Sequence, residues 1–322
     1  EMTSSLVGSE MCIRDRTKEM INFVPGIVPG IGMAMNCFTQ KGDKVMIQPP
    51  VYHPFAWVTT RNERTLVINP LRWENGMYRM DLDAFREQIK GCKLFILCNP
   101  HNPGGVVWTE AELRAIADIC YDEKVLVFSD EIHADLTLPP HTHRPFATVS
   151  EKARMNSVTF MSPSKAFNMP GLSASHALIF NEDLRKRFRI YMDAGELDMG
   201  HVFAFLSVEA AYSHGTEWLD QCLAYIQGNI DFVDEFLKKH APKIKAIRPE
   251  ASYLVWLDCR ELELSQKDLN EFFVDKAHLA LNDGEMFGKE GIGFMRLNVA
   301  SPRCIIEKAM KQLADAYQLY IK

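Results

Sequence analysis

The chain has 322 residues, of which 47% are hydrophobic and 24% charged, and its formal net charge is −6 at pH 7. This length and composition are typical of a globular protein with a large core, and they favour two domains with a cleft between them. The acidic excess argues against nucleic acid as a partner, because binding a phosphate backbone needs a basic surface.

The sequence also argues against a membrane or secreted protein. No apolar run reaches the ~20 residues that a membrane helix needs, and the N-terminus lacks the basic-then-apolar order of a secretory signal. The eight cysteines are scattered and form no CxxC pair. We therefore expect a cytoplasmic protein with reduced thiols that acts on small molecules.

The N-terminal segment differs from the rest of the chain. Residues 1–16 show neither a strand pattern nor a capped helix, and the stretch 5–16 looks like translated sequencing-adaptor read-through. We expect residues 1–16 to be a non-native or artefactual segment, with the natural start of the protein lost.

Six short apolar runs alternate with amphipathic stretches between residues 44 and 180. Runs that are apolar without alternation are typical of parallel strands covered by helices on both faces. The expected strands lie at 44–48, 65–69, 94–98, 125–129, 157–161 and 176–180. Among the intervening helices, one is marked by a capping box of Thr109 and Glu112, and another opens at Asp81 and runs through Ile89.

The pattern changes in the second half of the chain. Residues 184–239 are mainly helical and read as a connector into a second lobe, in which strands at 253–257 and 293–298 flank a helix at 265–275. A terminal helix follows Pro302. We therefore predict an α/β protein. Its domains are a large domain at 17–220 with a mainly parallel, doubly wound sheet, and a small α+β C-terminal domain at 221–322.

Three polar sequences begin where predicted strands end. They are NPHNPGG at 99–105, SDEIH at 129–133 and SPSKAFN at 162–168. Each alone would be an ordinary turn or a solvated edge. Because doubly wound sheets bind ligands beyond the carboxyl ends of their strands, the three together indicate one site.

With PGIVPG at 25–30 and PPVYHPF at 49–55, these motifs resemble the fold-type I pyridoxal-phosphate enzymes, the aspartate aminotransferase superfamily, over residues 17–322. Within that superfamily they look like the carbon–sulfur β-lyase branch, related to the regulatory cystathionine β-lyases of bacteria. His133 favours this branch, since aminotransferases of the group more often have Tyr there.

The resemblance implies that pyridoxal 5'-phosphate (PLP) is held as an imine on Lys165, whose amine later acts as a base. Asp130 would pair with the pyridine nitrogen and keep it protonated, so that the ring absorbs carbanion charge. Asn102 would bond the ring hydroxyl, Tyr52 would stack on the ring face, and His133 would also contact the cofactor.

The resemblance also implies a phosphate site made mainly of neutral donors, at serine hydroxyls and at a helix N-terminus. The candidate phosphate ligands are Ser162, Ser164, Gly26, Ile27 and Val28. Many relatives carry a cation eight residues after the lysine, where this chain has Ser173. Backbone amides would therefore carry more of the phosphate binding.

Arg296 lies inside a strand-like run, where a buried guanidinium without a carboxylate partner is costly. The resemblance assigns to it the substrate α-carboxylate, which a planar guanidinium binds through two hydrogen bonds. A salt bridge to Asp258 or Glu285 is the alternative, purely structural interpretation.

The activity implied by the resemblance is cleavage of cystathionine, or of related cysteine S-conjugates, to a thiol, pyruvate and ammonia. The substrate would be a small amino acid and the protein a homodimer, with a further N-terminal segment in relatives that completes the small domain and lends a tyrosine to the neighbouring site. A class I/II aminotransferase is the alternative, because it shares every step up to the carbanion.

Two other functions are less favoured. A metal-dependent hydrolase could use Asp130, Glu131, His133, His141 and His143, but their spacing differs from that of HExxH enzymes and the last two lie in a Pro-rich segment, so we expect no metal. Some members of this lyase group also bind transcriptional regulators, which leaves a regulatory protein partner open.

Overall fold

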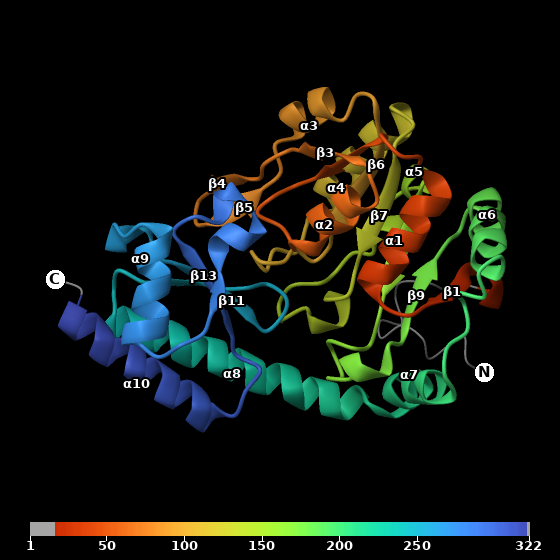
Figure 1. The fold of residues 1–322 in the computed structure, drawn as a ribbon. Coiled ribbons are helices and arrows are strands. Elements are labelled where there is room, and N and C mark those ends of the chain that lie inside the picture. Colours follow the sequence, from red (N-terminus) through yellow and green to blue (C-terminus); the bar gives the residue numbers. More distant parts are fainter. Residues whose placement is uncertain (1–16, 321–322) are drawn as a thin grey trace.

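The computed structural model describes residues 17–320, so the expectation for residues 1–16 lies outside the described part of the chain. The large domain is built on a seven-stranded sheet (Figure 1). In order across the sheet, the strands are β1 (Ile21–Val24), β9 (Ser175–Leu178), β8 (Ser157–Met161), β7 (Leu126–Asp130), β6 (Cys92–Cys98), β2 (Lys44–Ile47) and β3 (Thr65–Ile68).

Helices cover both faces of this sheet. Along β6, Phe95 and Leu97 face one hydrophobic core, whereas Leu94 and Ile96 face another. The first core packs against α3 (Leu82–Gln88), α4 (Glu110–Asp122) and α5 (Glu151–Met155), and the second against α1 (Ile27–Phe38), α2 (Pro54–Arg61) and α6 (Glu182–Asp193). The doubly wound sheet predicted from unbroken apolar runs is confirmed.

The direction of one predicted strand differs from expectation. The apolar pattern groups the run at 176–180 with the parallel strands. In the structure, β9 pairs antiparallel with β8 and with β1. A parallel connection needs a crossover, usually a helix. Residues 162–174 contain only a 3-10 turn at Pro170–Leu172, and they turn the chain straight back beside β8. Helices on both faces bury β9 as fully as its parallel neighbours, so its apolar pattern did not show its direction.

Local signals at the helix ends are confirmed. The Thr109 hydroxyl accepts from the backbone of Glu112, whose carboxylate accepts from the Thr109 backbone in return. Asp81 caps α3 by accepting from the Ala84 backbone N–H. The sequence did not indicate β1 or the hairpin of β4 (Arg72–Glu74) and β5 (Met77–Arg79).

The small domain is a four-stranded antiparallel sheet with helices. Its strands, in sheet order, are β10 (Lys245–Ile247), β11 (Leu254–Asp258), β13 (Phe294–Asn298) and β12 (Asn282–Asp283), with helices α9 (Gln266–Glu271) and α10 (Arg303–Tyr320). The helices α7 (Val202–His214) and α8 (Thr216–His240) lead into it, and α8 runs along the molecule from α7 to α10 (Figure 1). The predicted boundary at residue 220 falls within α8 and stays a prediction.

The two domains meet along a hydrogen-bonded seam. The carbonyl oxygen of Gly105, in the loop after β6, accepts from the backbone of both Glu250 and Ala251. The Glu250 carboxylate accepts from the Val107 N–H at 2.8 Å, and Ser252 donates its N–H to Leu136 O. The small domain is thus anchored directly beside the loops at the strand ends. Across residues 17–320, no helix is long and apolar enough to cross a membrane.

We expect Gly284→Ala to destabilise the small domain. A Cβ at Gly284 would collide with the carbonyl oxygens of Gly291 and Phe294, which are backbone atoms that cannot swing away. The free energy of unfolding should fall by about 2 kcal/mol or more. Gly171→Ala is the matched control, because it also lies in a 3-10 turn and its Cβ would meet nothing within 4 Å. Thermal unfolding of both variants checks this, and equal midpoints would contradict it.

Candidate active site

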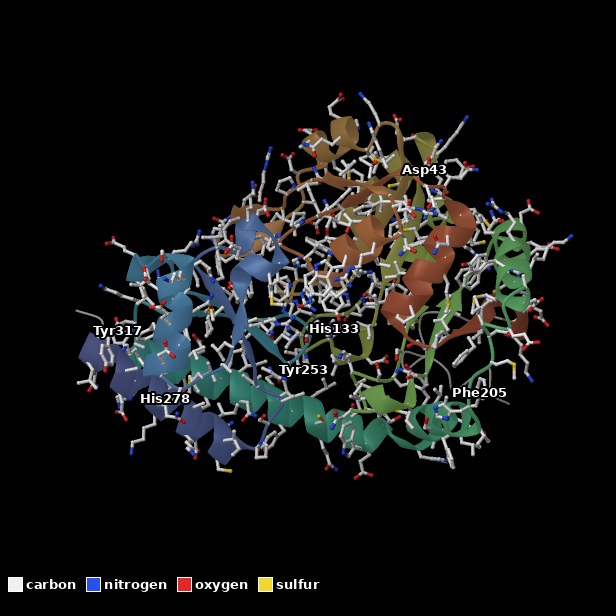
Figure 2. All side chains as sticks on the ribbon, in the orientation of Figure 1. Asp43, His133, Phe205, Tyr253, His278 and Tyr317 are labelled. Atoms are coloured by element: carbon white, nitrogen blue, oxygen red, sulfur yellow. The ribbon has the colours of Figure 1, made fainter. Side chains whose placement is uncertain are left out.

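A cavity of ≈ 470 Å³ lies at the carboxyl ends of β6, β7 and β8, and small-domain residues close its other side. Figure 2 shows two of its lining residues, His133 and Tyr253, near each other in the middle of the molecule; their ring centroids are 6.4 Å apart. The predicted site residues that line it are Gly26, Ile27, Val28, Tyr52, Asn102, Asp130, His133, Ser164, Lys165 and Arg296. Ser162 is the predicted residue that does not line it.

Strand register explains why three of these residues meet. Cys98, the last residue of β6, pairs with Asp130, the last residue of β7, which in turn pairs with Phe160 of β8. Asn102 and Lys165 each follow four residues after the end of their strand. Since the three strands are parallel and in step, their ends deliver Asn102, Asp130 and Lys165 to one edge of the sheet.

Asp130 is a buried carboxylate, 4% exposed, that accepts from the Ile132 N–H at 3.1 Å. Burial raises its pKa to about 7; the Ile132 hydrogen bond opposes this, the Glu131 carboxylate adds to it, and Lys165 also opposes it. Among the described residues, Asp130 forms no salt bridge. A protonated ring nitrogen is the kind of partner that would favour its charged form.

Arg296 is held by two amides rather than by a carboxylate. It donates from Nη1 to Asn102 Oδ1 and from Nη2 to Asn282 Oδ1, both at 2.8 Å, and its guanidinium lies 4.6 Å from the Phe287 ring centroid. Burial lowers its pKa to about 10, so it is charged at neutral pH. Its buried Nε has no hydrogen-bond partner within the described residues.

The alternative interpretation of Arg296 as part of a structural salt bridge is wrong. Asp258 pairs instead with Arg260 at 2.6 Å, and Arg296 forms no ion pair with Asp258 or Glu285. The reason is the register of the strands: Arg296 lies opposite Trp256 on β11, so Asp258 lies two residues further along the strand, beside Phe294.

The N-terminus of α1 borders the cavity. The backbone hydrogen bond of Gly30 to Gly26 O is the first in this helix, so the N–H groups of Ile27 and Val28 have no acceptor within it. Gly26 has φ = 151° and no side-chain cap covers these donors. Lys165 and Arg296 are the lysine and arginine side chains that line the cavity. Its α1 end therefore presents neutral hydrogen-bond donors of the kind that suit an anion.

The two serines before Lys165 have different surroundings. Ser162 is buried; its hydroxyl donates to Ala174 O at 2.8 Å and accepts from the Ser164 N–H at 3.2 Å. These two hydrogen bonds hold the loop that carries Lys165 in position. Ser164 faces the cavity, as do Ser173 and Ser175.

Histidine and tyrosine side chains complete the walls. Burial, with the nearby charges of Lys165 and Arg296, lowers the pKa of His133 to about 3, so this imidazole is neutral. Burial also raises the pKa of Tyr52. The lining residues that the sequence interpretation did not single out include His53, Ser175, Tyr253 and Asn298. His53 could have been found, because it follows Tyr52 in the PPVYHPF motif. Asn298 could also have been found, because it lies two residues after Arg296 on the same strand face.

The residues considered for a metal site fall into separate groups, since Asp130 and His133 line the cavity, whereas Glu131 and His143 contact each other outside it. Glu131 points away from the cavity; it contacts His143 Nε2 at 2.8 Å and accepts from the Ser129 hydroxyl and the Phe146 N–H. The Nδ1 atom of His141 lies 3.7 Å from the Oε1 atom of Glu250. Residues 17–320 contain no group of three or more His, Cys, Asp or Glu placed to hold a metal ion.

The sequence matches the family model for aminotransferase class I and II over residues 4–313. The chain belongs to this family. It is 39% identical to cystathionine beta-lyase PatB of Bacillus subtilis, across 92% of this chain and 78% of that protein.

Solved structures agree with this family assignment. Cystalysin from Treponema denticola, which contains PLP, superimposes with a TM-score of 0.92 at 35% identity, over 94% of this chain and 78% of that one. A PLP-bound C-S lyase from Staphylococcus hominis gives 0.87 at 32% identity, over 95% and 80%. The resemblance seen in the sequence motifs is thereby confirmed.

We expect Asp130 to make the cofactor-free protein less stable as pH rises. Its folded pKa is raised above the unfolded value, so the folded state binds the extra proton below about pH 7 and loses that stabilisation as pH passes through about 7. Asp130→Asn cannot titrate. The free energy of unfolding of this variant, relative to that of the wild type, should rise by about 2 to 3 kcal/mol from pH 5 to pH 8. Urea unfolding at both pH values checks this, and a constant difference would contradict the raised pKa.

Proposed function

We propose that this chain is a PLP-dependent carbon–sulfur β-lyase that cleaves cystathionine or related cysteine S-conjugates to a thiol, pyruvate and ammonia. The observation that carries the proposal is the meeting of Lys165, a buried Asp130 carboxylate and an Arg296 without a carboxylate partner in one cavity. The 39% identity to a cystathionine beta-lyase and the likeness to two PLP-containing enzymes support it.

The cavity residues fit PLP as the cofactor. When bound, PLP supplies a cationic ring that accepts the electron pair left on the substrate Cα. Lys165 would be the attachment point of PLP, and Asp130 would accept a hydrogen bond from the ring nitrogen. Asn102 uses its oxygen for Arg296, which leaves its Nδ2 free to donate to the ring hydroxyl oxygen. Tyr52 would pack on the ring face, next to the neutral His133.

The N-terminus of α1 would hold the cofactor phosphate. The free N–H groups of Ile27 and Val28 and the hydroxyl of Ser164 would donate to it, and Gly26 would let it approach the backbone closely. Ser162 contributes indirectly, because its bond to Ala174 O positions the loop of Ser164 and Lys165.

Arg296 binds the substrate α-carboxylate. Its bonds to Asn102 and Asn282 orient the planar guanidinium before the substrate arrives. The Lys165 amine then takes the Cα proton. The Cβ–S bond breaks with its electron pair on sulfur, the thiol leaves protonated, and one water molecule supplies the oxygen of pyruvate as ammonia is released.

A product assay tests this function. With L-cystathionine, the PLP-loaded protein should release pyruvate and thiol in equal amounts without any added oxo acid. An aminotransferase would instead consume an oxo acid and release no thiol. Lys165→Ala should lose at least about 1,000-fold in turnover, because the attachment point and the base are lost together. Lys186→Ala, an exposed lysine on α6, is the matched control.

We expect Arg296→Ala to raise the KM for cystathionine between about 10- and 100-fold, since a charge-assisted pair with the carboxylate is lost. The visible absorbance of bound PLP should persist, because the proposed cofactor contacts remain. Arg296→Lys keeps the charge but not the planar pair of donors, so its KM should be intermediate. Steady-state kinetics and absorbance spectra measure both effects. Loss of the PLP absorbance would assign Arg296 a structural role.

We further propose that the protein works in the cytoplasm as a homodimer. Buried free thiols, such as Cys92, Cys98 and Cys259, suit a reducing compartment. Apolar side chains gather around α7, where Figure 2 labels Phe205 at the edge of the molecule. Five of them are between 44% and 75% exposed: Met199, Val202, Phe203, Phe205 and Leu206. Contiguous exposed apolar surface is typical of an interface.

We expect Phe203→Asp to shift the protein toward monomer, because burying a carboxylate in an apolar interface without a partner is costly. Sedimentation velocity at several protein concentrations measures this. Ile190→Asp, at another exposed apolar side chain away from α7, is the control. A wild-type protein that is monomeric at every concentration would contradict the homodimer.

A further inference from the structure

A second buried carboxylate lies next to Asp130, on the side away from the cavity. Glu131 is 1% exposed and does not line the active-site cavity. Successive residues of an extended chain point to opposite sides, so Asp130 faces the cavity and Glu131 faces the protein interior. A buried carboxylate is unfavourable unless it is paired and hydrogen-bonded. The place of Glu131 makes it a candidate to act on the site through Asp130.

Three hydrogen-bond donors surround the Glu131 carboxylate. Its Oε1 accepts from the Ser129 hydroxyl at 2.7 Å and from the Phe146 N–H at 2.8 Å, and its Oε2 lies 2.8 Å from His143 Nε2. Ser129 is fully buried, and the His143 side chain is 9% exposed. Donors that converge on one carboxylate away from water suit its charged form.

The segment that carries two of these donors also holds the end of β6. Between His143 and Phe146, the carbonyl oxygen of Arg144 accepts from Asn99 Nδ2 at 3.1 Å. Asn99 is buried, and it directly follows β6 in the loop that leads to Asn102. Residues 143–146 therefore connect the ends of β6 and β7, and they hold the Glu131 carboxylate in a fixed position relative to Asp130.

Glu131 is one of two charged side chains that act on Asp130. Burial is the main cause of the raised pKa of Asp130; the Glu131 carboxylate raises this pKa further, and Lys165 opposes the rise. Burial and the Asp130 charge also raise the pKa values of the Tyr52 hydroxyl and the Cys98 thiol, which keeps both groups neutral. A second negative charge favours the protonated form of its neighbour, because like charges repel strongly where water is excluded.

We propose that Glu131 is a positioning residue whose charge keeps a proton at Asp130 and, with PLP bound, would keep it on the ring nitrogen that Asp130 contacts. The second part rests on the proposed lyase function. Asp130 and the ring nitrogen would share one proton, and a further negative charge beside them makes loss of that proton less favourable. The ring would thereby stay able to accept the electron pair from the substrate Cα.

Glu131→Gln removes the charge and preserves the hydrogen bonds. The amide oxygen can replace Oε1 and accept from the Ser129 hydroxyl and the Phe146 N–H. The amide nitrogen can replace Oε2 and donate to His143 Nε2 in the tautomer that accepts there. Any effect of this variant on Asp130 therefore reports the charge rather than lost contacts.

Carbon-13 NMR of the cofactor-free protein, labelled at the aspartate carboxyl carbon, measures the titration of Asp130, whose signal Asp130→Asn assigns. We expect the midpoint to fall by about one pH unit in Glu131→Gln. Asp135→Asn is the matched control. Asp135 is also a carboxylate whose pKa is raised by burial, but it accepts from the Tyr212 hydroxyl and does not act on the pKa of Asp130. Its substitution should leave the midpoint at the wild-type value. Equal midpoints in wild type and Glu131→Gln would overturn the proposal.

Glutamate labelling provides a second test that needs only the wild-type protein. The Glu131 carboxyl carbon, assigned through its contact with the Phe146 N–H, should report an ionised group throughout the titration of Asp130. A protonated Glu131 at pH 7 would overturn the proposal, including in the case that Glu131→Gln does not fold.

The PLP-loaded enzyme separates this inference from the lyase function. In Glu131→Gln, kcat for L-cystathionine should fall about tenfold while KM stays unchanged, because the retained proton acts in the transition state and not in substrate binding. Release of pyruvate with the same kcat in both proteins would overturn the part of the inference that concerns the ring nitrogen. If neither protein releases pyruvate, the lyase function fails, and the NMR titration still decides whether Glu131 controls the proton at Asp130.

Discussion

The buried carboxylate of Asp130 is the constraint on which the rest of the site depends. It ends the central strand β7 at 4% exposure and forms no salt bridge among the described residues. Removing a carboxylate from water without a cationic partner is unfavourable, which is why its pKa rises to about 7. In the proposed function, a cofactor with a protonated ring nitrogen would offset this cost.

The Arg296–Asn102 hydrogen bond connects the two halves of the site. Asn102 belongs to the loop after β6 in the large domain, and Arg296 lies on β13 of the small domain. The amide therefore presents its oxygen to the substrate-binding side and its nitrogen to the proposed ring-binding side. The seam around Gly105, three residues further on, fixes the same loop against Glu250 and Ala251. In the proposed function, one loop would therefore couple cofactor orientation to binding of the substrate carboxylate.

Charge is distributed unevenly through the site. The α1 end of the cavity contains backbone donors and serine hydroxyls, including Ser173, which has a left-handed backbone conformation. Formal charge is concentrated at Asp130, Lys165 and Arg296, where the proposed chemistry needs it. Neutral donors at the phosphate give directional binding without a further buried cation that would have to be desolvated.

The sequence alone determined six of the seven strands of the large sheet, where helices begin at Thr109 and Asp81, and which polar residues follow the strands, because these depend on local pattern and local hydrogen bonds. It also identified the motifs of Lys165, Asp130 and Asn102. The antiparallel direction of β9 needed the tertiary structure, because burial on both faces gives the same apolar pattern in either direction.

Other features arise from contacts between residues far apart in the chain, which no local pattern encodes. Arg296 meets Asn102 across 194 residues, and the Ser162 hydroxyl is taken by Ala174 O rather than turned to the cavity. A second cavity, beside Lys165, combines α8 with Tyr253 and Asn298. The sequence placed the reactive groups at strand ends, whereas only the packing of the small domain against those ends decided which partners they have.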